Sequence, residues 1–410
     1  MRMGLLTIGL LAAPLLAAPV PTAPANVPAF KPAFAGQTRA EAVRTKMPLA
    51  VTEIATGLNK PRALAFLPDG RMLVTEKAAS SIRIVARDGS KSAALTGTPK
   101  TDTRGQGGML DVAVAPDFAT SRTIFWSYAE PRTGGNGLAV ARGVLNGTAL
   151  AEVKVIFRMQ PTLDSVMHSG GRLVFAPDGM LFVTMGERSI LPGRVQAQDL
   201  ASDFGKIARI DRDGVPAKGN PFVGKAGARA EIWSSGHRNV LSAALDARGR
   251  LWEVEMGPQG GDELNLVGAG KDYGWPTISY GEEYSGKPIG RGITIAPGLE
   301  QPVYYWDPTI SPAGMAIHSG KGMPEWRGDI FIGGLSAKSL VRLVMKGDRV
   351  VGEERLLTER GDRVREVVEG PDGALYLLTD ASNGKLLRVG PTVAPVSSAS
   401  SGAASLRSRR

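Results

Sequence analysis

A pattern of apolar run, tight turn and second apolar run recurs along most of the chain. Each copy joins two short stretches rich in Val, Ile, Leu or Phe through a turn that carries Asp and Gly, residues suited to positive φ. This pattern predicts a β-hairpin. Six copies occur, at residues 63–76, 111–130, 172–187, 242–257, 314–335 and 366–380.

Further short apolar runs between the hairpins, such as SIRIVAR, AEIWSSG, SLVRLVM and KLLRVG, supply additional strands. Four strands per unit, repeated around an axis, predict an all-β fold: a six-bladed β-propeller of four-stranded antiparallel blades. The alternative is a β-sandwich in which common turn dipeptides recur by coincidence. Six copies with strands in the same order favour the propeller. Polar, Gly-rich loops follow the second strand of each hairpin, and we expect them to gather on one functional face.

The two ends of the chain differ in composition from the repeats. Residues 1–18 contain Arg2, an apolar stretch and small residues at Ala17 and Ala18, which predicts a cleaved secretory signal and export to a periplasm. An uncleaved anchor is the alternative. Residues 19–47 are expected to be a linker, residues 48–390 the propeller, and residues 391–410 a disordered basic tail.

Composition narrows the chemistry. The chain has no cysteine, which excludes disulfides, thiolate metal sites and cysteine nucleophiles. The formal net charge of +10 fits nucleic acid, an acidic surface or a small anionic ligand as partner. An exported chain without a nucleic-acid-binding module argues against nucleic acid. After residue 18, no stretch approaches the ~20 apolar residues of a membrane span, so none is expected.

Scarce side chains before predicted strands are the first candidates for catalysis. His168, one of three histidines in the chain, precedes Gly170 and Gly171. A neutral imidazole there suits a general base, whereas a histidine that caps a strand end is the structural alternative. In GHRN, Arg238 and Asn239 offer donors to carboxylate or carbonyl oxygens, although an arginine that bridges two blades would look the same.

Binding candidates lie in other loops. The irregular backbone around Gly257 and Pro258, with Asp262 or Glu263 near it, offers carbonyls suited to Ca²⁺, and a plain long turn is the alternative. Lys338, Arg363 and Arg365 lie in consecutive repeats. The spacing of Arg363 and Arg365 puts both on one strand face, either around a polycarboxylate or in solvent. Gln106, on a Gly-rich approach to a strand, is a weak candidate for a sugar hydroxyl.

As an ordered set, several motifs resemble the soluble pyrroloquinoline quinone (PQQ) dependent sugar dehydrogenases, the glucose/sorbosone dehydrogenase family, and most of all its periplasmic aldose sugar dehydrogenase branch. The motifs are GLNKPRALAFLPDG, GQGGMLD, HSGGRLVFAPDG, IWSSGHRN, GPQGGDELN, KDYGWP and GDRVREVVEGPDGALYLLTD, which cover roughly residues 51–389. The family fold is a six-bladed propeller, in agreement with the repeat count.

The resemblance implies a role for each candidate. His168 matches the base that takes the proton of the anomeric hydroxyl while hydride passes to C5 of PQQ, giving a lactone. Arg238 is implied beside the quinone carbonyls, and Gln106 on the substrate side. The carbonyls of Gly257 and Pro258 match those that bind Ca²⁺. Residues implied to hold PQQ, which has three carboxylates, are Asn239, Thr309, Lys338, Arg363 and Arg365.

Two positions depart from the glucose dehydrogenase branch of the family. Met167 replaces an acidic residue that precedes the histidine there and that would orient the imidazole, and Arg188 replaces a glutamine. Both changes leave base strength and sugar preference open.

Other functions and partners remain to be weighed against an aldose dehydrogenase. A non-catalytic propeller that binds sugars or proteins is one alternative, and a Ca²⁺-dependent lactonase is the other. The lactonase would need more inward carboxylates than Asp262 and Glu263. The external electron acceptor is undetermined, and both a monomer and a homodimer are compatible with the sequence.

Overall fold

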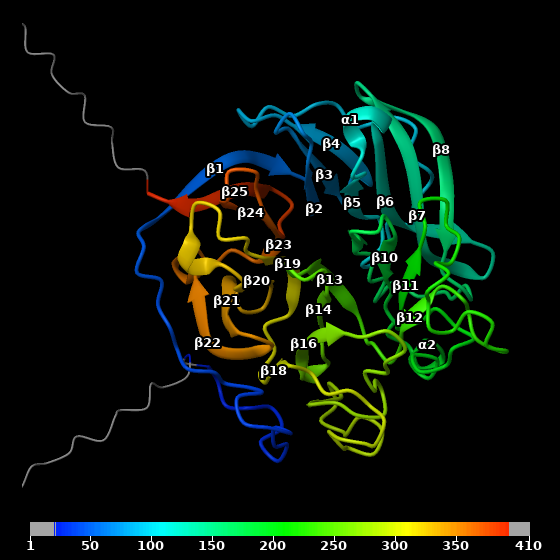
Figure 1. Ribbon diagram of the computed structural model, residues 1–410, viewed down its shortest axis with the longest axis vertical. Coiled ribbons are helices and arrows are strands. Elements are labelled where there is room, and N and C mark those ends of the chain that lie inside the picture. Colours follow the sequence, from blue (N-terminus) through cyan, green and yellow to red (C-terminus); the bar gives the residue numbers. More distant parts are fainter. Residues whose placement is uncertain (1–19, 21, 393–410) are drawn as a thin grey trace, which may run out of the picture.

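The computed structural model describes residue 20 and residues 22–392, which form six antiparallel sheets arranged around a central axis (Figure 1). The prediction of an all-β, six-bladed propeller is therefore confirmed. The predicted signal at residues 1–18 lies outside the described residues, as does the predicted tail at residues 391–410 except for Pro391 and Thr392; Pro391 ends the last strand of the chain. Among the described residues, none of the helices has the length and apolar composition needed to cross a membrane.

Each predicted hairpin forms the first two strands of one blade, numbered here in chain order. Blade 1 contains β2 (Pro61–Phe66), β3 (Met72–Glu76) and β4 (Ser81–Val85). Blade 2 contains β5 (Met109–Val114), β6 (Thr123–Arg132), β7 (Gly135–Asn146) and β8 (Ala149–Arg158). Blade 3 contains β9 (Leu173–Phe175), β10 (Leu181–Thr184), β11 (Ile207–Ile210) and β12 (Ile232–Ser234).

Blade 4 contains β13 (Val240–Leu245), β14 (Leu251–Glu255), β16 (Asp262–Val267) and β18 (Tyr304–Trp306). Blade 5 contains β19 (Pro312–Ile317), β20 (Ile330–Gly334), β21 (Ser339–Lys346) and β22 (Arg349–Leu356). Blade 6 contains β23 (Val364–Glu369), β24 (Leu375–Thr379), β25 (Gly384–Pro391) and β1 (Leu49–Leu58). A small extra sheet pairs β15 (Gln259–Gly260) with β17 (Gly281–Glu282).

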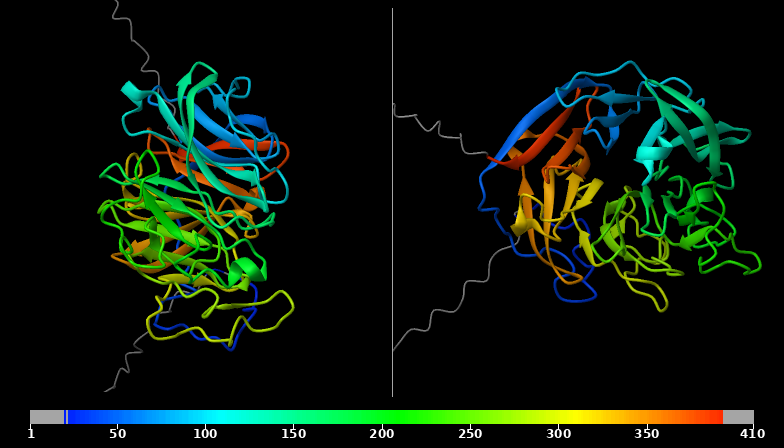
Figure 2. Two further views of the ribbon diagram at one scale, coloured as in Figure 1. Left: turned by 90° about the vertical axis from the view of Figure 1, so that its right-hand side faces the viewer. Right: turned by 45° about the horizontal axis from the view of Figure 1, so that its top comes forward.

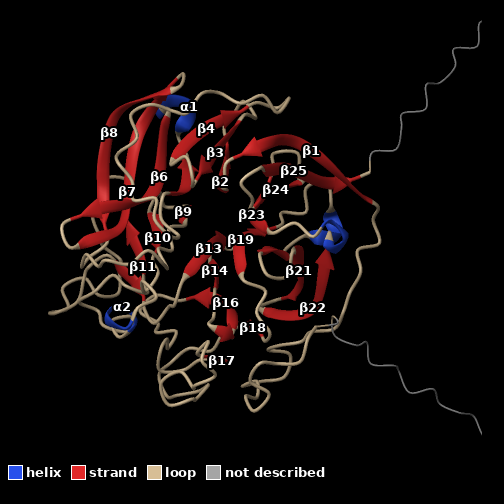
Figure 3. Ribbon diagram, turned by 180° about the vertical axis from the view of Figure 1, so that it is seen from behind, coloured by secondary structure: helices blue, strands red, loops and turns tan. Residues whose placement is uncertain are grey.

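The hairpin turns have the backbone that their residues require. Gly70 and Gly179, the glycines of two Pro-Asp-Gly turns, have φ of 83° and 82°. A side chain strongly disfavours this conformation, so glycine sets the turn and with it the register of the strands. Helical segments are few and short in the described chain: α1 (Phe118–Ser121), α2 (Leu191–Arg194) and two 3₁₀ turns (Pro324–Trp326 and Thr358–Arg360) (Figure 3).

Blade 1 differs from the expected four strands, because only β2, β3 and β4 pair there. After β4, Val85 forms a single bridge with Lys91, and Thr96 then bridges Ala149 of the neighbouring blade. The segment that would be the fourth strand therefore turns toward blade 2. The other five blades have four strands each.

The first strand in the chain, β1, completes the last blade by pairing with β25, from Leu49↔Pro391 to Leu58↔Gly384. The two ends of the propeller are thus joined in one sheet, which closes the ring (Figure 2). This pairing covers the outer edge of β25, which would otherwise be left unpaired.

Apolar cores fill the spaces between neighbouring blades, with one main cluster for each adjacent pair. Trp126 of blade 2 is fully buried against blade 1, and Trp326 is fully buried between blades 5 and 6. Because burial of one large apolar side chain contributes about 1.5–3 kcal/mol, these interfaces hold the ring rigid. The rigid ring fixes the loops at its two ends.

Inside the ring, an ion-pair network crosses the central channel. The Arg172 guanidinium lies 3.2 Å from Oδ1 of Asp111 and 2.6 Å from Oε2 of Glu366. These residues come from three different blades, so the network ties the three blades together inside the ring. Burial raises the pKa of Glu366 to about 7, against the opposing effect of Arg172.

Residues 22–47, expected to be a linker, have no helix or long strand but lie against blades 4 and 5 (Figure 1). The amides of Asn26 and Val27 donate to Asp307 at 2.8 and 3.0 Å. Fully buried Gln37 donates through Nε2 to the carbonyl of Pro302 at 2.8 Å. This segment therefore covers the outer strand of blade 4 before the chain enters β1.

Candidate active site

The predicted site residues lie at the same end of their blades. His168, Asn239, Thr309 and Arg363 come directly before or near the first strand of a blade, whereas Gly257 follows a second strand. In an antiparallel sheet, the start of one strand and the end of its neighbour meet at one edge. The two kinds of loop therefore gather at one mouth of the channel, as expected.

Hydrogen bonds join these loops across blades 2, 3 and 4. Oε1 of Gln106 accepts the amide of His168 at 2.9 Å. Oδ1 of Asn239 accepts the amide of Gly170 at 3.2 Å. Each bond links the entry loop of one blade to that of the next, so the backbone around His168 is held from both sides.

Similar contacts join the loops of blade 4 and blade 5. Oδ2 of Asp262 accepts the amides of Ile310 and Ser311 at 2.7 Å each, which fixes the loop after Thr309. Ser336 Oγ donates to the carbonyl of Thr309 at 3.2 Å. Blade 5 is thereby joined to blade 4 at this mouth.

Arg363 and Arg62 connect the loops of blades 5, 6, 1 and 2. Arg363 donates through Nη1 to the carbonyl of Leu335 at 3.2 Å. Arg62 donates to the carbonyl of Gln106 at 3.3 Å, and the charge of Arg365 acts on it. The contacts return to Gln106, so His168 and the arginines of blade 6 belong to the same rim.

His168 is nine-tenths buried and held in a defined orientation. Its backbone has a φ of 46°, and its Nδ1 lies 2.7 Å from Oε1 of Glu187, in the loop after β10. Oε2 of the same carboxylate accepts the amide of Ser189 at 2.9 Å. Because the carboxylate accepts the Nδ1 proton, the lone pair of the neutral ring is left on Nε2.

The surroundings of His168 also favour its neutral form. Burial lowers the pKa of His168, and the positive charges of Arg238 and Arg188 lower it further, while the hydrogen bond to Glu187 opposes them. The net direction is downward. At neutral pH the ring is therefore an unprotonated imidazole, the form that a general base needs.

The two departures from the glucose dehydrogenase branch of the family have different consequences. Met167 is partly exposed and offers no carboxylate, but Glu187 contacts the imidazole from another loop. Arg188 is 1 % exposed and donates to the carbonyl of His168 at 3.2 Å and to Oγ of Ser169 at 2.9 Å. It thus supports the backbone under His168.

Arg238 lies at the junction of blades 3 and 4. Its guanidinium stacks on Trp275 at 5.2 Å and donates to the carbonyls of Met256 and Gly257 at 2.8 and 2.7 Å. The predicted Ca²⁺ ligand Gly257 thus already accepts one hydrogen bond, and buried Pro258 follows it in the same loop. A carbonyl oxygen has a second lone pair, so this contact still leaves one for a cation.

The two basic residues of blade 6, Arg363 and Arg365, are paired through one carboxylate. Asp380 Oδ2 lies 3.2 Å from Nη2 of Arg363 and 3.0 Å from Nη2 of Arg365. Burial alone would raise the pKa of Asp380, but the two arginines outweigh it and lower that pKa. Burial lowers the pKa of nearby Arg62 to about 9, helped by the charge of Arg365. Lys338 is exposed, with a φ of 48°.

Comparison with known proteins agrees with this architecture. Residues 58–388 match the model of the glucose/sorbosone dehydrogenase family. The chain belongs to the glucose/sorbosone dehydrogenase family. The aldose sugar dehydrogenase YliI of Escherichia coli (strain K12) is 43% identical over 340 residues, which cover 82% of this chain and 91% of that protein.

Solved structures of this family superpose closely. A glucose dehydrogenase crystal structure gives a TM-score of 0.81 at 46% identity, covering 84% of this chain and all of the other. The PQQ-bound aldose sugar dehydrogenase of Streptomyces coelicolor gives 0.69 at 30% identity, with 84% of this chain and 100% of the other covered.

The rim has features that suit a flat, acidic cofactor of the kind bound in that structure. Nδ2 of Asn239 is buried and makes no hydrogen bond with the described residues, although Oδ1 of the same amide is bound. A Cβ on Gly186 would lie 2.7 Å from Oδ1 of Asn239 and 2.3 Å from the carbonyl of His168. Glycine is therefore required between the two residues, and a free donor remains beside them.

Several residues of the site were not anticipated from the sequence. Glu187 holds His168, Asp380 pairs the two arginines, and Arg62 joins the rim at Gln106. In the sequence, Glu187 and Asp380 are single acidic residues at the ends of second strands. Neither carboxylate could be assigned a partner from the sequence, because its partner lies in another loop.

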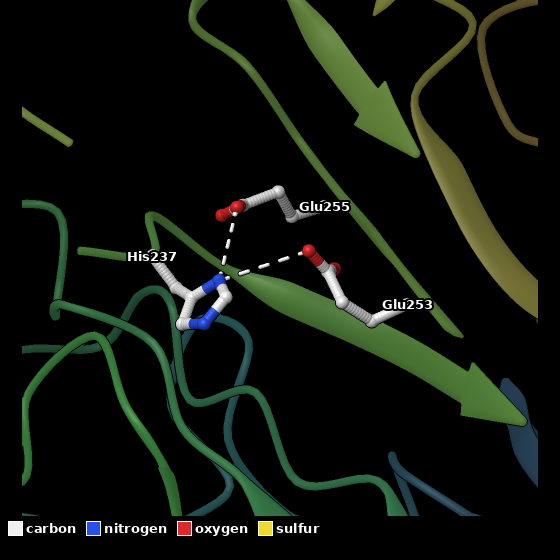
Figure 4. A group of neighbouring side chains, drawn as sticks. All are labelled: His237, Glu253 and Glu255. Atoms are coloured by element: carbon white, nitrogen blue, oxygen red, sulfur yellow. Dashed lines mark hydrogen bonds and ion pairs between the residues drawn. The ribbon is translucent and has the colours of Figure 1, made fainter. Parts of the chain in front are cut away.

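His237, the neighbour of Arg238 in the chain, forms a group with Glu253 and Glu255 that the sequence also left unassigned (Figure 4). The sequence feature that could have revealed this group is the Glu-Val-Glu spacing at the end of β14, since residues i and i+2 of a strand share a face. The carboxylates expected near the Ca²⁺ loop are engaged otherwise. Asp262 accepts three backbone amides, and Oε2 of Glu263 lies 3.2 Å from Nδ2 of Asn265.

Proposed function

We propose that this chain is a quinoprotein aldose dehydrogenase that oxidises sugars at the anomeric carbon to lactones with PQQ and Ca²⁺. The observation that carries the proposal is His168, a buried neutral imidazole whose Nδ1 is held by Glu187 and whose Nε2 is free among the described residues. Family membership and relatives that carry the names of aldose sugar dehydrogenases support the same conclusion.

The residues of blades 5 and 6 supply the charge that a tricarboxylate requires. We assign PQQ binding to Asn239, Thr309, Lys338, Arg363 and Arg365, and Ca²⁺ binding to the carbonyls of Gly257 and Pro258. When bound, PQQ supplies the hydride acceptor at C5, and Ca²⁺ polarises the quinone. Nδ2 of Asn239, which has no hydrogen-bond partner among the described residues, is a donor available to a carbonyl oxygen of such a ligand.

His168 performs the proton transfer. Its Nε2 accepts the proton of the anomeric hydroxyl as hydride leaves the anomeric carbon, and the charge that then forms on the ring is stabilised by Glu187. Arg238, stacked on Trp275, places a fixed positive charge on the same side of the rim, where negative charge grows during the reaction. Gln106 holds the backbone of His168 through Oε1 and leaves its amide nitrogen for substrate.

The composition of the N-terminal residues supports a proposal for the location of the enzyme. Residues 1–18 have the composition of a secretory signal, and we infer export to the periplasm. A periplasmic enzyme of this kind passes electrons to an external acceptor, and an artificial dye replaces that acceptor in an assay.

Dye reduction tests the proposal directly. Purified protein, freed of metal and cofactor, is supplied with PQQ, Ca²⁺ or both and given a panel of aldoses. We expect dye reduction only when PQQ and an aldose are both present, with Ca²⁺ raising the rate. Dye reduction without PQQ, or none with any aldose, would contradict the proposal. Lactone hydrolysis with Ca²⁺ alone would favour a lactonase.

A further inference from the structure

A buried cluster of one histidine and two glutamates adjoins the active-site loop of blade 4. His237 and Glu253 are fully buried and Glu255 is 4 % exposed. Their ligand atoms all lie within 4.8 Å of one another. Both carboxylates point at the same ring nitrogen of the histidine (Figure 4). Among the described residues, no lysine or arginine forms an ion pair with either carboxylate.

Hydrogen bonds alone leave this cluster incompletely satisfied. Nδ1 of His237 lies 3.2 Å from Oε1 of Glu255 and 3.7 Å from Oε1 of Glu253, and a single N–H can serve only the nearer oxygen. Among the described residues, Oε2 of Glu253 is buried and has no hydrogen-bond partner. A buried carboxylate with an unbalanced charge is costly, and a cation bound at either of its oxygens relieves that cost.

We propose that His237, Glu253 and Glu255 bind a divalent transition-metal ion of the Zn²⁺ type. The two distances from Nδ1, 3.2 and 3.7 Å, bracket the separation of about 3.4 Å between ligands of a tetrahedral ion with bonds near 2.1 Å. One imidazole nitrogen and two carboxylates form a donor set suited to Zn²⁺. Ca²⁺, in contrast, prefers oxygen ligands alone.

The surroundings hold each ligand in the orientation that a metal site needs. Nε2 of His237 lies 2.9 Å from Oγ of Ser234, which leaves Nδ1 as the coordinating atom, and the ring stacks on Tyr273 at 4.8 Å. Such a partner on the far nitrogen accompanies almost every metal-binding histidine. Asn265 donates to Oε1 of Glu253 at 2.8 Å and so orients that carboxylate.

The ion would also support the active site. Oε2 of Glu255 accepts the amides of Arg238 and Asn239, the second at 3.2 Å. The same carboxylate would thus bind the metal through Oε1 and hold the loop of the two site residues through Oε2. This role is independent of the proposed reaction, because it concerns the stability of the loop.

A zinc titration tests the proposal. The full-length protein is stripped with chelator, placed in excess Ca²⁺ to fill oxygen-only sites, and titrated with Zn²⁺ by calorimetry. The His168→Asn background removes the imidazole beside Glu187 as a competing ligand. We expect one Zn²⁺ per chain and a higher Tm. No binding, or displacement of the Zn²⁺ by Ca²⁺, would overturn the proposal.

Two variants in the same background locate the ion. Glu253→Gln removes one ligand charge and keeps the side-chain shape, so we expect Zn²⁺ affinity to fall at least 100-fold. The matched control is Glu76→Gln. Glu76 is a buried carboxylate at the end of the second strand of blade 1, where it pairs with Arg83. The Zn²⁺ affinity of this variant should equal that of the parent. Equal affinity in the two variants would refute the assignment.

A spectrum keeps the proposal testable if Glu253→Gln fails to fold. Co²⁺ added to the stripped His168→Asn protein should give the visible d–d bands of a four-coordinate ion with nitrogen and oxygen ligands, and Zn²⁺ should abolish them. A spectrum of six-coordinate Co²⁺ identical to the ion in buffer would contradict the site.

Discussion

The rim of the channel has two halves with opposite character. In blades 3 and 4, His168, Arg238 and Asn239 are at most 6 % exposed, and each makes hydrogen bonds of defined geometry. In blades 5 and 6, Lys338 and Arg363 are exposed. Proton transfer requires atoms held in place, whereas an anionic ligand is attracted over a distance by charge. The buried half is therefore expected to control the rate, and the basic half to control cofactor retention.

Replacing the base should give the largest effect. His168→Asn removes the proton acceptor at Nε2 and keeps a polar side chain of moderate size, so we expect kcat to fall about 10²- to 10⁴-fold. PQQ affinity should stay within a factor of two or three, because the basic half is unchanged. Steady-state dye reduction and a PQQ titration measure the two quantities. Nearly unchanged turnover would show that His168 is not the base.

The double variant Arg363→Ala and Arg365→Ala should show the reverse pattern. Each arginine is expected to form a charge-assisted hydrogen bond worth about 1.5–3 kcal/mol, so loss of both should weaken PQQ binding at least about 10²-fold. At saturating PQQ, kcat should stay close to that of the parent protein. Equal PQQ affinity would remove both arginines from the cofactor site.

Glu187→Gln tests how the buried half is organised. The hydrogen bond to Glu187 opposes the lowering of the His168 pKa, so its loss should move that pKa further down. We expect the acid limb of kcat/KM in the parent protein to lie below the ordinary imidazole value of about 6.5, and in Glu187→Gln to shift to still lower pH. Poorer orientation should lower kcat on the order of tenfold to a hundredfold.

Ser189→Ala is the control for Glu187→Gln, because the donor to Glu187 is the backbone amide of Ser189 and not its hydroxyl. An acid limb at the same pH in Glu187→Gln and the parent protein would show that the carboxylate does not act on the base.

The sequence predicted the propeller because each hairpin is a local unit. Pro-Asp-Gly turns such as the one at Gly179 have a backbone that few other residues adopt, so the pattern survives folding. The missing fourth strand of blade 1 was not visible, since the course of residues 86–100 depends on Ala149 of the neighbouring blade. Local patterns thus predict hairpins well and blade edges poorly.

The same contrast applies to the site. His168 and Arg238 stood out because they are scarce or lie in a family motif, and their loops do meet at one rim. Their partners did not stand out. Glu187 reaches His168 across a whole hairpin, and Asp380 reaches Arg365 across 15 positions. Such pairs depend on how loops pack, which composition and spacing leave open.

Asp380→Asn is the smallest change and the sharpest test of the basic half. Asp380 partly neutralises Arg363 and Arg365, so its replacement should leave two unpaired guanidiniums and tighten PQQ binding. The partly exposed pair between Asp380 and Arg363 contributes about 0.2–1 kcal/mol, which predicts a gain of about 1.4- to fivefold at low salt. The gain should shrink at 0.15 M salt, where the screening length is about 8 Å. Weaker PQQ binding in Asp380→Asn would mean instead that the carboxylate holds the arginines in position, and the basic half would then be as preorganised as the buried one.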